Sequence, residues 1–180
     1  MQVIFEGLDR CGKDTQITKF INNNKDKIFH TLKYSSLPFK DSEEYSLKLY
    51  KKLFELLLST DYNFICNRAH LGETVYAPIY RGYNSSEEIF NYEKIYLSDI
   101  NDIFLIVFVD EAQNLFLRDD GLGLSTSIED IEEEKLAFEL AFERSSIKNK
   151  LLINIDKKSP HDVEVMINNF INGQQNSSNL

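Results

Sequence analysis

Positive charge is scarce in this chain of 180 residues, which has 20 lysines and arginines against 29 aspartates and glutamates. The formal net charge is -9 at pH 7. Duplex nucleic acid and anionic membranes both require a basic face on the protein that binds them. The charge balance therefore argues against nucleic acid and membranes as main partners. A small anionic substrate, held by local cations, remains compatible with it.

Cysteines and long apolar runs are also few. Cys11 and Cys66 carry no metal-ligand spacing, so we expect free thiols in a reducing compartment. No apolar run approaches the length that crosses a bilayer. The N-terminus, "MQVIFEGLDR", lacks the basic region and cleavage site of a signal peptide. We therefore expect a cytoplasmic protein.

The length and apolar content allow one proper core. With 180 residues and 42% hydrophobic residues, the chain is too short for two comfortable domains. No internal repeat or linker divides it. The last eight residues, "GQQNSSNL", are polar and without periodicity. The sequence thus predicts a single domain over residues 1–172 and a disordered tail over residues 173–180.

Five short apolar runs alternate with segments of helical spacing. The runs, rich in Ile, Val, Phe and Leu, cover residues 2–6, 27–34, 62–66, 103–109 and 150–155. Such runs suit strands buried on both faces. The last helix has a start signal, because Ser159 can cap it, Pro160 suits its first position and Asp162 can close a capping box. This alternation predicts an α/β fold of three layers, with a five-stranded parallel sheet flanked by helices.

The stretch "GLDRCGKDT", residues 7–15, comes close to the loop that wraps nucleotide phosphates. Gly7, Gly12 and Lys13 fit the pattern of Gly, four residues, Gly and Lys, and the loop lies between a predicted strand and a predicted helix. In that setting backbone N–H groups surround the phosphates, and the lysine reaches the β and γ oxygens. The plainer alternative is a glycine turn with a surface lysine. The agreement of motif and context favours the phosphate loop.

Asp14 occupies the position where this pattern has Ser or Thr. A carboxylate can bind Mg²⁺ as a hydroxyl does, but it adds negative charge beside the phosphates, so nucleotide binding should depend more on the metal. Thr15 could supply a hydroxyl one position later. Alternatively, Asp14 is only a favourable charge in the first helical turn.

Together these segments resemble the thymidylate kinase group of P-loop deoxynucleoside monophosphate kinases, and particularly its compact phage-type members. The resemblance rests on "FEGLDRCGKDTQ", on "NR" at residues 67–68, on "IFLIVFVD" and on "LLINID", in order and spacing over residues 2–171. It implies a five-stranded parallel sheet with a lid, and transfer of a phosphoryl group from ATP to a deoxynucleoside monophosphate, usually dTMP. A viral member would act in the host cytoplasm.

The resemblance also assigns roles to residues of the loop. It implies that Asp9 lies near the acceptor nucleotide and the metal, and that Arg10 supplies a cation to the transition state. Lys13 completes the catalytic group, and a solvated Arg10 is the alternative. The implied ATP-binding residues are Gly7, Leu8, Asp9, Arg10, Cys11, Gly12, Lys13, Asp14 and Thr15.

At the end of the third strand, the "Asp-Arg" of the group is replaced by Asn67 and Arg68. Arg68 can still bind the acceptor phosphate through its planar guanidinium. The aspartate that would polarise water on Mg²⁺ is missing. One hypothesis is that Asp14 has taken over this metal contact.

The stretch "AHLGETVYAPIYRGY", residues 69–83, departs from the commonest pattern of the group. Glu73, Tyr76 and Arg81 offer a carboxylate for a sugar hydroxyl, an aromatic face for a base and a second cation. Tyr76 and Tyr80 could equally pack a helix against the sheet. The resemblance further suggests that Phe39, in the loop after the second strand, contacts the base.

A lid is expected at residues 116–127, "FLRDDGLGLSTS", after the fourth strand. Closing such a loop would exclude water from the reaction. Arg118 is its single basic residue, which makes it a catalytic candidate and leaves the main cationic role to Arg10. The acidic run at residues 128–135 fits a solvated helix start better than a metal site.

Two classes of function follow. The first is a kinase that uses ATP and Mg²⁺, with a deoxynucleoside monophosphate or an unphosphorylated deoxynucleoside as acceptor. The second is a P-loop protein that binds nucleotide without transferring phosphate. Arg68 and Arg81 favour the first class, since a switch needs no pair of cations facing a second phosphate. The sequence leaves open the accepted base and whether the protein forms a homodimer.

Overall fold

A computed structural model describes residues 1–34, 42–118, 121 and 123–177. Five parallel strands form its central sheet in the order β2-β3-β1-β4-β5. The strands are β1 (Gln2–Gly7), β2 (Phe29–Lys33), β3 (Asn63–Asn67), β4 (Ile103–Val109) and β5 (Asn149–Asn154). Each of the five predicted strands is present, so the expected α/β fold with a parallel sheet is confirmed.

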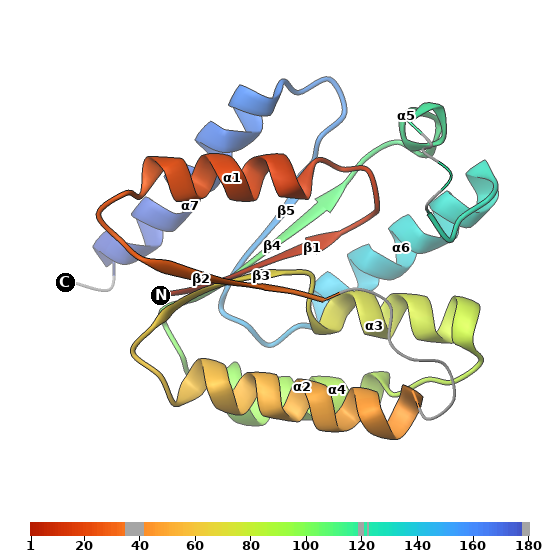
Figure 1. The fold of residues 1–180 in the computed structure, drawn as a ribbon. Coiled ribbons are helices and arrows are strands. Elements are labelled where there is room, and N and C mark those ends of the chain that lie inside the picture. Colours follow the sequence, from red (N-terminus) through yellow and green to blue (C-terminus); the bar gives the residue numbers. More distant parts are fainter. Residues whose placement is uncertain (35–41, 119–120, 122, 178–180) are drawn as a thin grey trace.

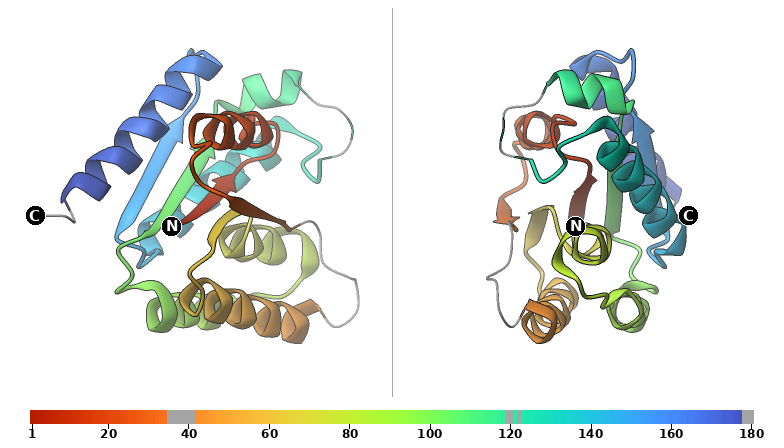
Figure 2. Two further views of the ribbon diagram at one scale, coloured as in Figure 1. Left: turned by 60° about the vertical axis from the view of Figure 1, so that its left-hand side comes forward. Right: turned by 90° about the vertical axis from the view of Figure 1, so that its right-hand side faces the viewer.

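Helices cover both faces of the sheet (Figures 1 and 2). The helices α1 (Lys13–Asn23) and α7 (Pro160–Ser177) lie side by side on one face. The other face carries α2 (Ser42–Leu58), α3 (His70–Tyr76), α4 (Ser86–Leu97) and α6 (Ile128–Arg144). The short helix α5 (Ala112–Leu117) contacts α6. None of the helices in the described part of the chain is long and apolar enough to cross a membrane.

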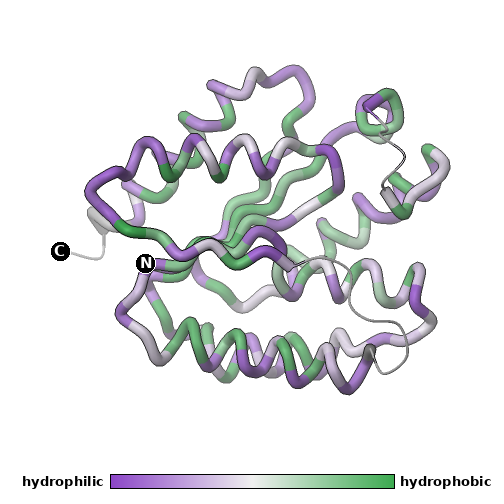
Figure 3. The backbone as a smooth tube through the Cα atoms, in the orientation of Figure 1, coloured by the Kyte–Doolittle hydropathy of each residue, from purple (hydrophilic) through white to green (hydrophobic). Residues whose placement is uncertain are grey.

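Burial explains the apolar runs. Every residue of β1 and of β4 is buried, whereas β2 at one edge of the sheet is partly exposed. Figure 3 shows the hydrophobic colour concentrated in the central strands and on the inner sides of the helices. Strands covered on both faces need no polar alternation, which is why the runs in the sequence are nearly continuous.

The cap predicted for the last helix is present. The Ser159 hydroxyl accepts a hydrogen bond from the Asp162 N–H at 3.2 Å, and the Asp162 carboxylate accepts one from the Ser159 N–H at 2.9 Å. Helix α7 continues to Ser177, so part of the segment expected to be a disordered tail is helical. The domain boundary at residue 172 stays a prediction.

The region after β3 is less regular than a single helix. Helix α3 is followed by one π-helical segment, η1 (Ala77–Arg81), which ends at Gly82 in the left-handed conformation, with φ of 74°. Pro78 lies in this segment and cannot donate an N–H bond, so the regular α-helical ladder is interrupted there. Arg81 is the last residue of this segment.

Candidate functional site

The loop at residues 7–12 connects β1 to α1 at the carboxyl edge of the sheet. Gly7 has φ of 117°, and a Cβ at that position would lie 2.0 Å from the Phe108 carbonyl oxygen. Gly12 has φ of 72° and precedes the first residue of α1. Both positions require glycine, the first for close packing on β4 and the second for its backbone conformation. The loop therefore has the context and the backbone that the phosphate-loop motif predicts.

Lys13 lies under this loop. Its ammonium group donates hydrogen bonds to the carbonyl oxygens of Gly7, at 2.9 Å, and of Leu8, and its residue is 6% exposed. Burial and the nearby charge of Arg68 lower the pKa of Lys13 to about 8. An anion bound in the loop would offset this desolvation and hold the lysine in its charged form.

The Asp14 side chain links α1 to the ends of two strands. One oxygen accepts a hydrogen bond from the Asn67 amide, and the other pairs with Lys33 at 3.3 Å. Burial raises the pKa of Asp14, but these two partners outweigh it and keep the pKa below its ordinary value. The N-cap residue is Gly12, and Asp14 lies in the first turn of the helix, where its charge is favourable. It is an ionised carboxylate held beside Lys13.

Arg10 points toward the predicted lid. Its guanidinium donates to the carbonyl oxygen of Leu115 at 3.2 Å and to the Ser125 hydroxyl at 3.1 Å. A Cβ on Gly123 would lie 2.7 Å from the same guanidinium. Arg10 has φ of 64°, a left-handed conformation that is strained for a residue with a side chain. Arg10 thus joins the phosphate loop to Leu115 and to Ser125 of the predicted lid, and its role as a transition-state cation stays a prediction.

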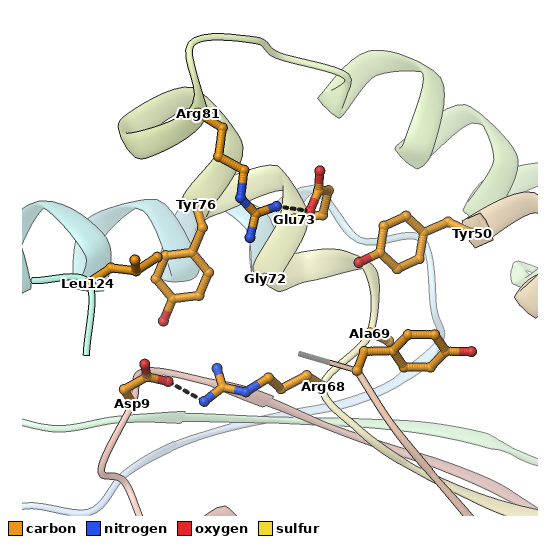
Figure 4. A pocket seen from close by; sticks show the side chains of 10 residues that line it. Asp9, Tyr50, Arg68, Ala69, Gly72, Glu73, Tyr76, Arg81 and Leu124 are labelled. Atoms are coloured by element: carbon orange, nitrogen blue, oxygen red, sulfur yellow. Dashed lines mark hydrogen bonds and ion pairs between the residues drawn. The ribbon is translucent and has the colours of Figure 1, made fainter. Parts of the chain in front are cut away.

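A cavity of about 270 Å³ opens beside the loop (Figure 4). We call it the Arg68 cavity. Its lining combines three tyrosines, two arginines and two carboxylates, and consists of Asp9, Tyr34, Tyr50, Arg68, Ala69, Gly72, Glu73, Tyr76, Arg81 and Leu124. Five of the six residues predicted to bind the acceptor line it. The sixth, Phe39, lies outside the described residues.

Each arginine of the Arg68 cavity is paired with a carboxylate (Figure 4). Arg68 donates to Asp9, and Arg81 donates to Glu73. Glu73 is 4% exposed and also accepts a hydrogen bond from the Tyr83 hydroxyl. The two ion pairs compensate the charges inside the cavity, which lowers the cost of burying them.

Tyr76 both packs against a neighbouring helix and lines the Arg68 cavity, and its contact with a base stays a prediction. Its ring packs edge-on against Phe138 of α6, with centroids 5.6 Å apart, and it also lines the Arg68 cavity. Its hydroxyl is buried and has no hydrogen-bond partner among the described residues, and burial holds the pKa of Tyr76 well above its ordinary value. Tyr80 is a packing residue, since its hydroxyl donates to the buried Glu134 at 2.6 Å.

A second cavity, of about 320 Å³, is lined by other residues of the same loop. We call it the Lys158 cavity, and it is lined by Arg10, Cys11, Gly12, Thr15, Gln16, Arg118, Ile155, Lys158, Pro160 and Val163. Arg118, predicted as a lid cation, pairs here with Asp110 at 2.8 Å, and Asp110 lies at the end of β4. Asp9 lines the first cavity and Arg10 the second, so the phosphate loop contributes residues to both.

Several site residues were not predicted from the sequence. Lys158 follows β5 and enters the second cavity, which the order of parallel strands could have indicated. Glu134 was assigned to a solvated acidic run, but it is 2% exposed. Its position three residues after Ile131 and four before Phe138 places it on the apolar face of α6, and that signal was overlooked.

Comparison with solved structures identifies the fold. The YorR protein from Bacillus subtilis, in complex with phosphorylated GDP, superimposes with a TM-score of 0.76 at 17% identity, over 98% of both chains. A thymidylate kinase from Candida albicans gives a TM-score of 0.66 at 16% identity, over 97% of this chain and 92% of that one. The chain has the P-loop kinase fold.

A third solved structure has a similar fold with a lower TM-score. The deoxyadenosine kinase from M. mycoides, with dCMP and a flexible dCDP bound, gives a TM-score of 0.56 at 14% identity, over 93% of this chain and 97% of that one. The sequence matches no protein-family model and no curated protein. The common feature of these structures is the arrangement of strands and helices around a phosphate loop.

Proposed function

We propose that this protein is a kinase that transfers the γ-phosphoryl group of ATP to a deoxynucleoside monophosphate, with dTMP as the first acceptor to test. The observation that carries the proposal is the presence of two cavities that are lined by adjacent residues of one phosphate loop. Phosphoryl transfer needs a donor and an acceptor on either side of the transferred group. Asp9 and Arg10, adjacent in the chain, line different cavities, so the two ligands would meet at this loop.

The Lys158 cavity suits the donor. It contains Gly12 and Thr15 at the start of α1, where backbone N–H groups favour phosphate oxygens. Lys13 lies below the same loop, and its charge would be directed at the phosphates once it exchanges its carbonyl partners for them. Lys158 and Pro160 form the outer wall, where the nucleoside end of ATP would lie.

The Arg68 cavity suits an acceptor that carries a phosphate. Arg68 lies beside the loop and is paired with Asp9, so an acceptor phosphate would compete for its guanidinium. Tyr50 and Tyr76 supply aromatic walls, and Glu73 supplies a buried carboxylate for a hydroxyl or an amino group. In the reaction, a phosphate oxygen of the acceptor attacks the γ-phosphorus and ADP leaves.

Asp14 fits the Mg²⁺ that such a reaction requires. It is ionised, its side chain is 71% exposed, and it lies at the start of α1 next to Lys13. Mg²⁺ is commonly bound through one or two carboxylates together with substrate phosphates and water, so a single carboxylate suffices. When bound, the ion would neutralise charge on the phosphates. Lys33 and Asn67 would hold the carboxylate in place.

One alternative acceptor is an unphosphorylated deoxynucleoside. Asp9 favours it, because a carboxylate in the same cavity as Arg68 could accept the proton of an attacking hydroxyl. The alternative of a different class is a protein that binds nucleotide without transfer. The paired arginines of the Arg68 cavity argue against it, because that cavity has no use in a protein with one nucleotide.

Release of ADP tests these alternatives. The purified protein is mixed with ATP and Mg²⁺, and ADP is measured with a panel of deoxynucleosides and their monophosphates, dGMP and dCMP included. We expect ADP release with at least one monophosphate and little with the matching nucleoside. Release with nucleosides alone would favour the deoxynucleoside kinase, and no release above the ATP-only control would favour the non-catalytic protein.

A further inference from the structure

The turn that presents Arg68 has an unfavourable backbone. Arg68 follows β3 and has φ of 66°, the left-handed conformation that costs a residue with a Cβ roughly 1–2 kcal/mol. Such a conformation persists only where the surrounding structure enforces it. Buried contacts on both sides of Arg68 enforce this backbone conformation.

Glu6 holds the first side. It is the next-to-last residue of β1 and is completely buried. One of its carboxylate oxygens accepts hydrogen bonds from the N–H of Ala69, at 2.7 Å, and of Gly72, at 3.3 Å. The Arg68 N–H itself donates to the Phe5 carbonyl at 2.8 Å. The end of β1 therefore binds three backbone N–H groups of the turn and of the first residues of α3.

His70 and Glu93 hold the other side. Both side chains are completely buried, and the His70 Nε2 lies 2.5 Å from a Glu93 oxygen. Glu93, on α4, also accepts hydrogen bonds from the hydroxyls of Ser145 and Ser146, each at 2.9 Å. Phe54 of α2 packs edge-on against the His70 ring, with the ring centroids 4.9 Å apart.

The protonation of this cluster follows from its contacts. Burial raises the pKa of Glu93, but the hydrogen bonds from His70 and Ser146 outweigh it and bring the pKa below its ordinary value. An ionised carboxylate only accepts hydrogen bonds, so the Nε2–H group of His70 is the donor and the Glu93 carboxylate is the acceptor. The start of α3 is thereby bound to α4 and to the connection between α6 and β5.

We propose that Glu6 and Glu93 are positioning residues that hold Arg68 in place for the acceptor phosphate. The inference rests on the proposed function, which makes Arg68 the acceptor-phosphate cation. Glu6 acts through the N–H groups of Ala69 and Gly72, and Glu93 acts through the imidazole of His70. Two buried carboxylates would be a costly way to provide packing alone, because apolar residues of similar volume often stabilise a protein as well or better.

Matched pairs of variants separate positioning from general stability. Glu6→Leu and Glu93→Leu remove the acceptor oxygens, whereas Glu6→Gln and Glu93→Gln keep one. Asn149→Ala is the stability control, because Asn149 bonds to the Asn101 carbonyl at 2.6 Å at the opposite edge of the sheet. For each protein we would measure the KM for the monophosphate, the KM for ATP and kcat. If a Leu variant at residue 93 does not fold, the double variant His70→Leu with Glu93→Leu replaces both polar partners by apolar ones.

We expect the Leu variants to raise the KM for the monophosphate about tenfold or more while the KM for ATP changes less than about twofold, since the lost bonds involve charged groups. The Gln variants should recover most of this loss, and Asn149→Ala should leave both KM values unchanged. Proportional changes in both KM values, or no recovery with Gln, would overturn the inference.

Amide hydrogen exchange gives a readout that needs no substrate. In the Leu variants, peptides that cover residues 67–76 should exchange faster than in the wild-type protein, while peptides of α7 should not. Unchanged exchange over residues 67–76 would refute the inference whatever the activity. A wild-type protein that phosphorylates no monophosphate would instead refute the proposed function.

Discussion

Lys13 is buried in the free protein against the loop that it serves. Its pKa of about 8 lies far enough below the ordinary value of 10.5 to make its charge depend on pH near neutrality. Between pH 8 and pH 10.5, binding of a polyphosphate requires that the lysine take up a proton. Below pH 8 the lysine is already protonated. The proposed function therefore implies that the affinity for ATP is coupled to pH.

We therefore predict that ATP binds more weakly as the pH rises above about 8. In Lys13→Arg this dependence should be absent, because a guanidinium stays charged throughout the range. Titration calorimetry with ATP from pH 7 to pH 10 checks both proteins. The same decline in Lys13→Arg would show that another group is responsible.

Arg68 combines a guanidinium that we propose to bind the acceptor phosphate with a strained backbone, and two substitutions separate these properties. Both Arg68→Ala and Arg68→Gly should impair use of the monophosphate by about 2–4 kcal/mol of transition-state stabilisation and leave ATP binding nearly unchanged. In urea unfolding, however, the Gly variant should be more stable than the Ala variant by about 1 kcal/mol, because φ of 66° is free of strain for glycine. If the variants lose ATP affinity as much as they lose use of the monophosphate, Arg68 belongs to the donor site instead. If the Gly and Ala variants are equally stable, the turn relaxes when the arginine is replaced.

Asp14 is tested by restoring the usual hydroxyl. If its carboxylate helps to hold Mg²⁺, Asp14→Ser should reduce repulsion of the phosphates and make ATP affinity less dependent on the Mg²⁺ concentration. A Mg²⁺ titration of ATP binding compares the two proteins, and Lys33→Ala, which removes a partner of Asp14, is the control for indirect effects. Indistinguishable Mg²⁺ curves for wild type and Asp14→Ser would remove the metal role from Asp14.

At the level of elements, α3 and η1 are attached to α6 by a hydrogen bond between Tyr80 and Glu134. Burial raises the pKa of Glu134 above its ordinary value of 4.5, and the bond from Tyr80 offsets part of that rise. Between 4.5 and the raised value, the folded chain binds more protons than the unfolded chain. The protonated form of Glu134 therefore stabilises the fold, and this contribution is lost as the pH rises through the folded-state pKa.

The raised pKa of Glu134 leads to a prediction for Glu134→Gln, which keeps an acceptor for Tyr80 but cannot ionise. Its free energy of unfolding should fall less than that of the wild-type protein as the pH is raised from 4 to 7. Urea denaturation at several pH values measures the difference. Parallel curves for the two proteins would show that Glu134 does not titrate in this interval.

The elements themselves were largely predictable. The five strands are short, and the central three are largely apolar and buried, so their composition marks them, and Ser159 and Asp162 form the expected cap. The region after β3 was not predictable in detail. Pro78 interrupts the helix there, and its π-helical turn depends on how Tyr80 and Arg81 find partners on other elements.

For the whole molecule, the parallel sheet brings the ends of all five strands to one edge, and the site forms there. The phosphate loop could be predicted because its residues are contiguous in the sequence. Its glycines are required by the backbone, one by close packing and one by a left-handed conformation. The buried hydrogen bonds behind Arg68 could not be predicted, because they join distant residues. Glu6 and Ala69 are 63 positions apart, and His70 and Glu93 are 23 apart. No local pattern in the sequence relates such pairs.

The central claim is that ATP and a monophosphate meet across the phosphate loop and exchange a phosphoryl group. Its most direct test is to incubate the protein with ATP labelled in the γ-phosphate, Mg²⁺ and dTMP, and to separate the nucleotides, with Lys13→Ala as the inactive control. The account predicts label in dTDP for the wild-type protein and none for a folded Lys13→Ala, whose charge serves the phosphates. If dTMP is not accepted, the label should appear in the diphosphate of another monophosphate of the panel. Label that stays in ATP or appears only as inorganic phosphate with every acceptor would contradict the account.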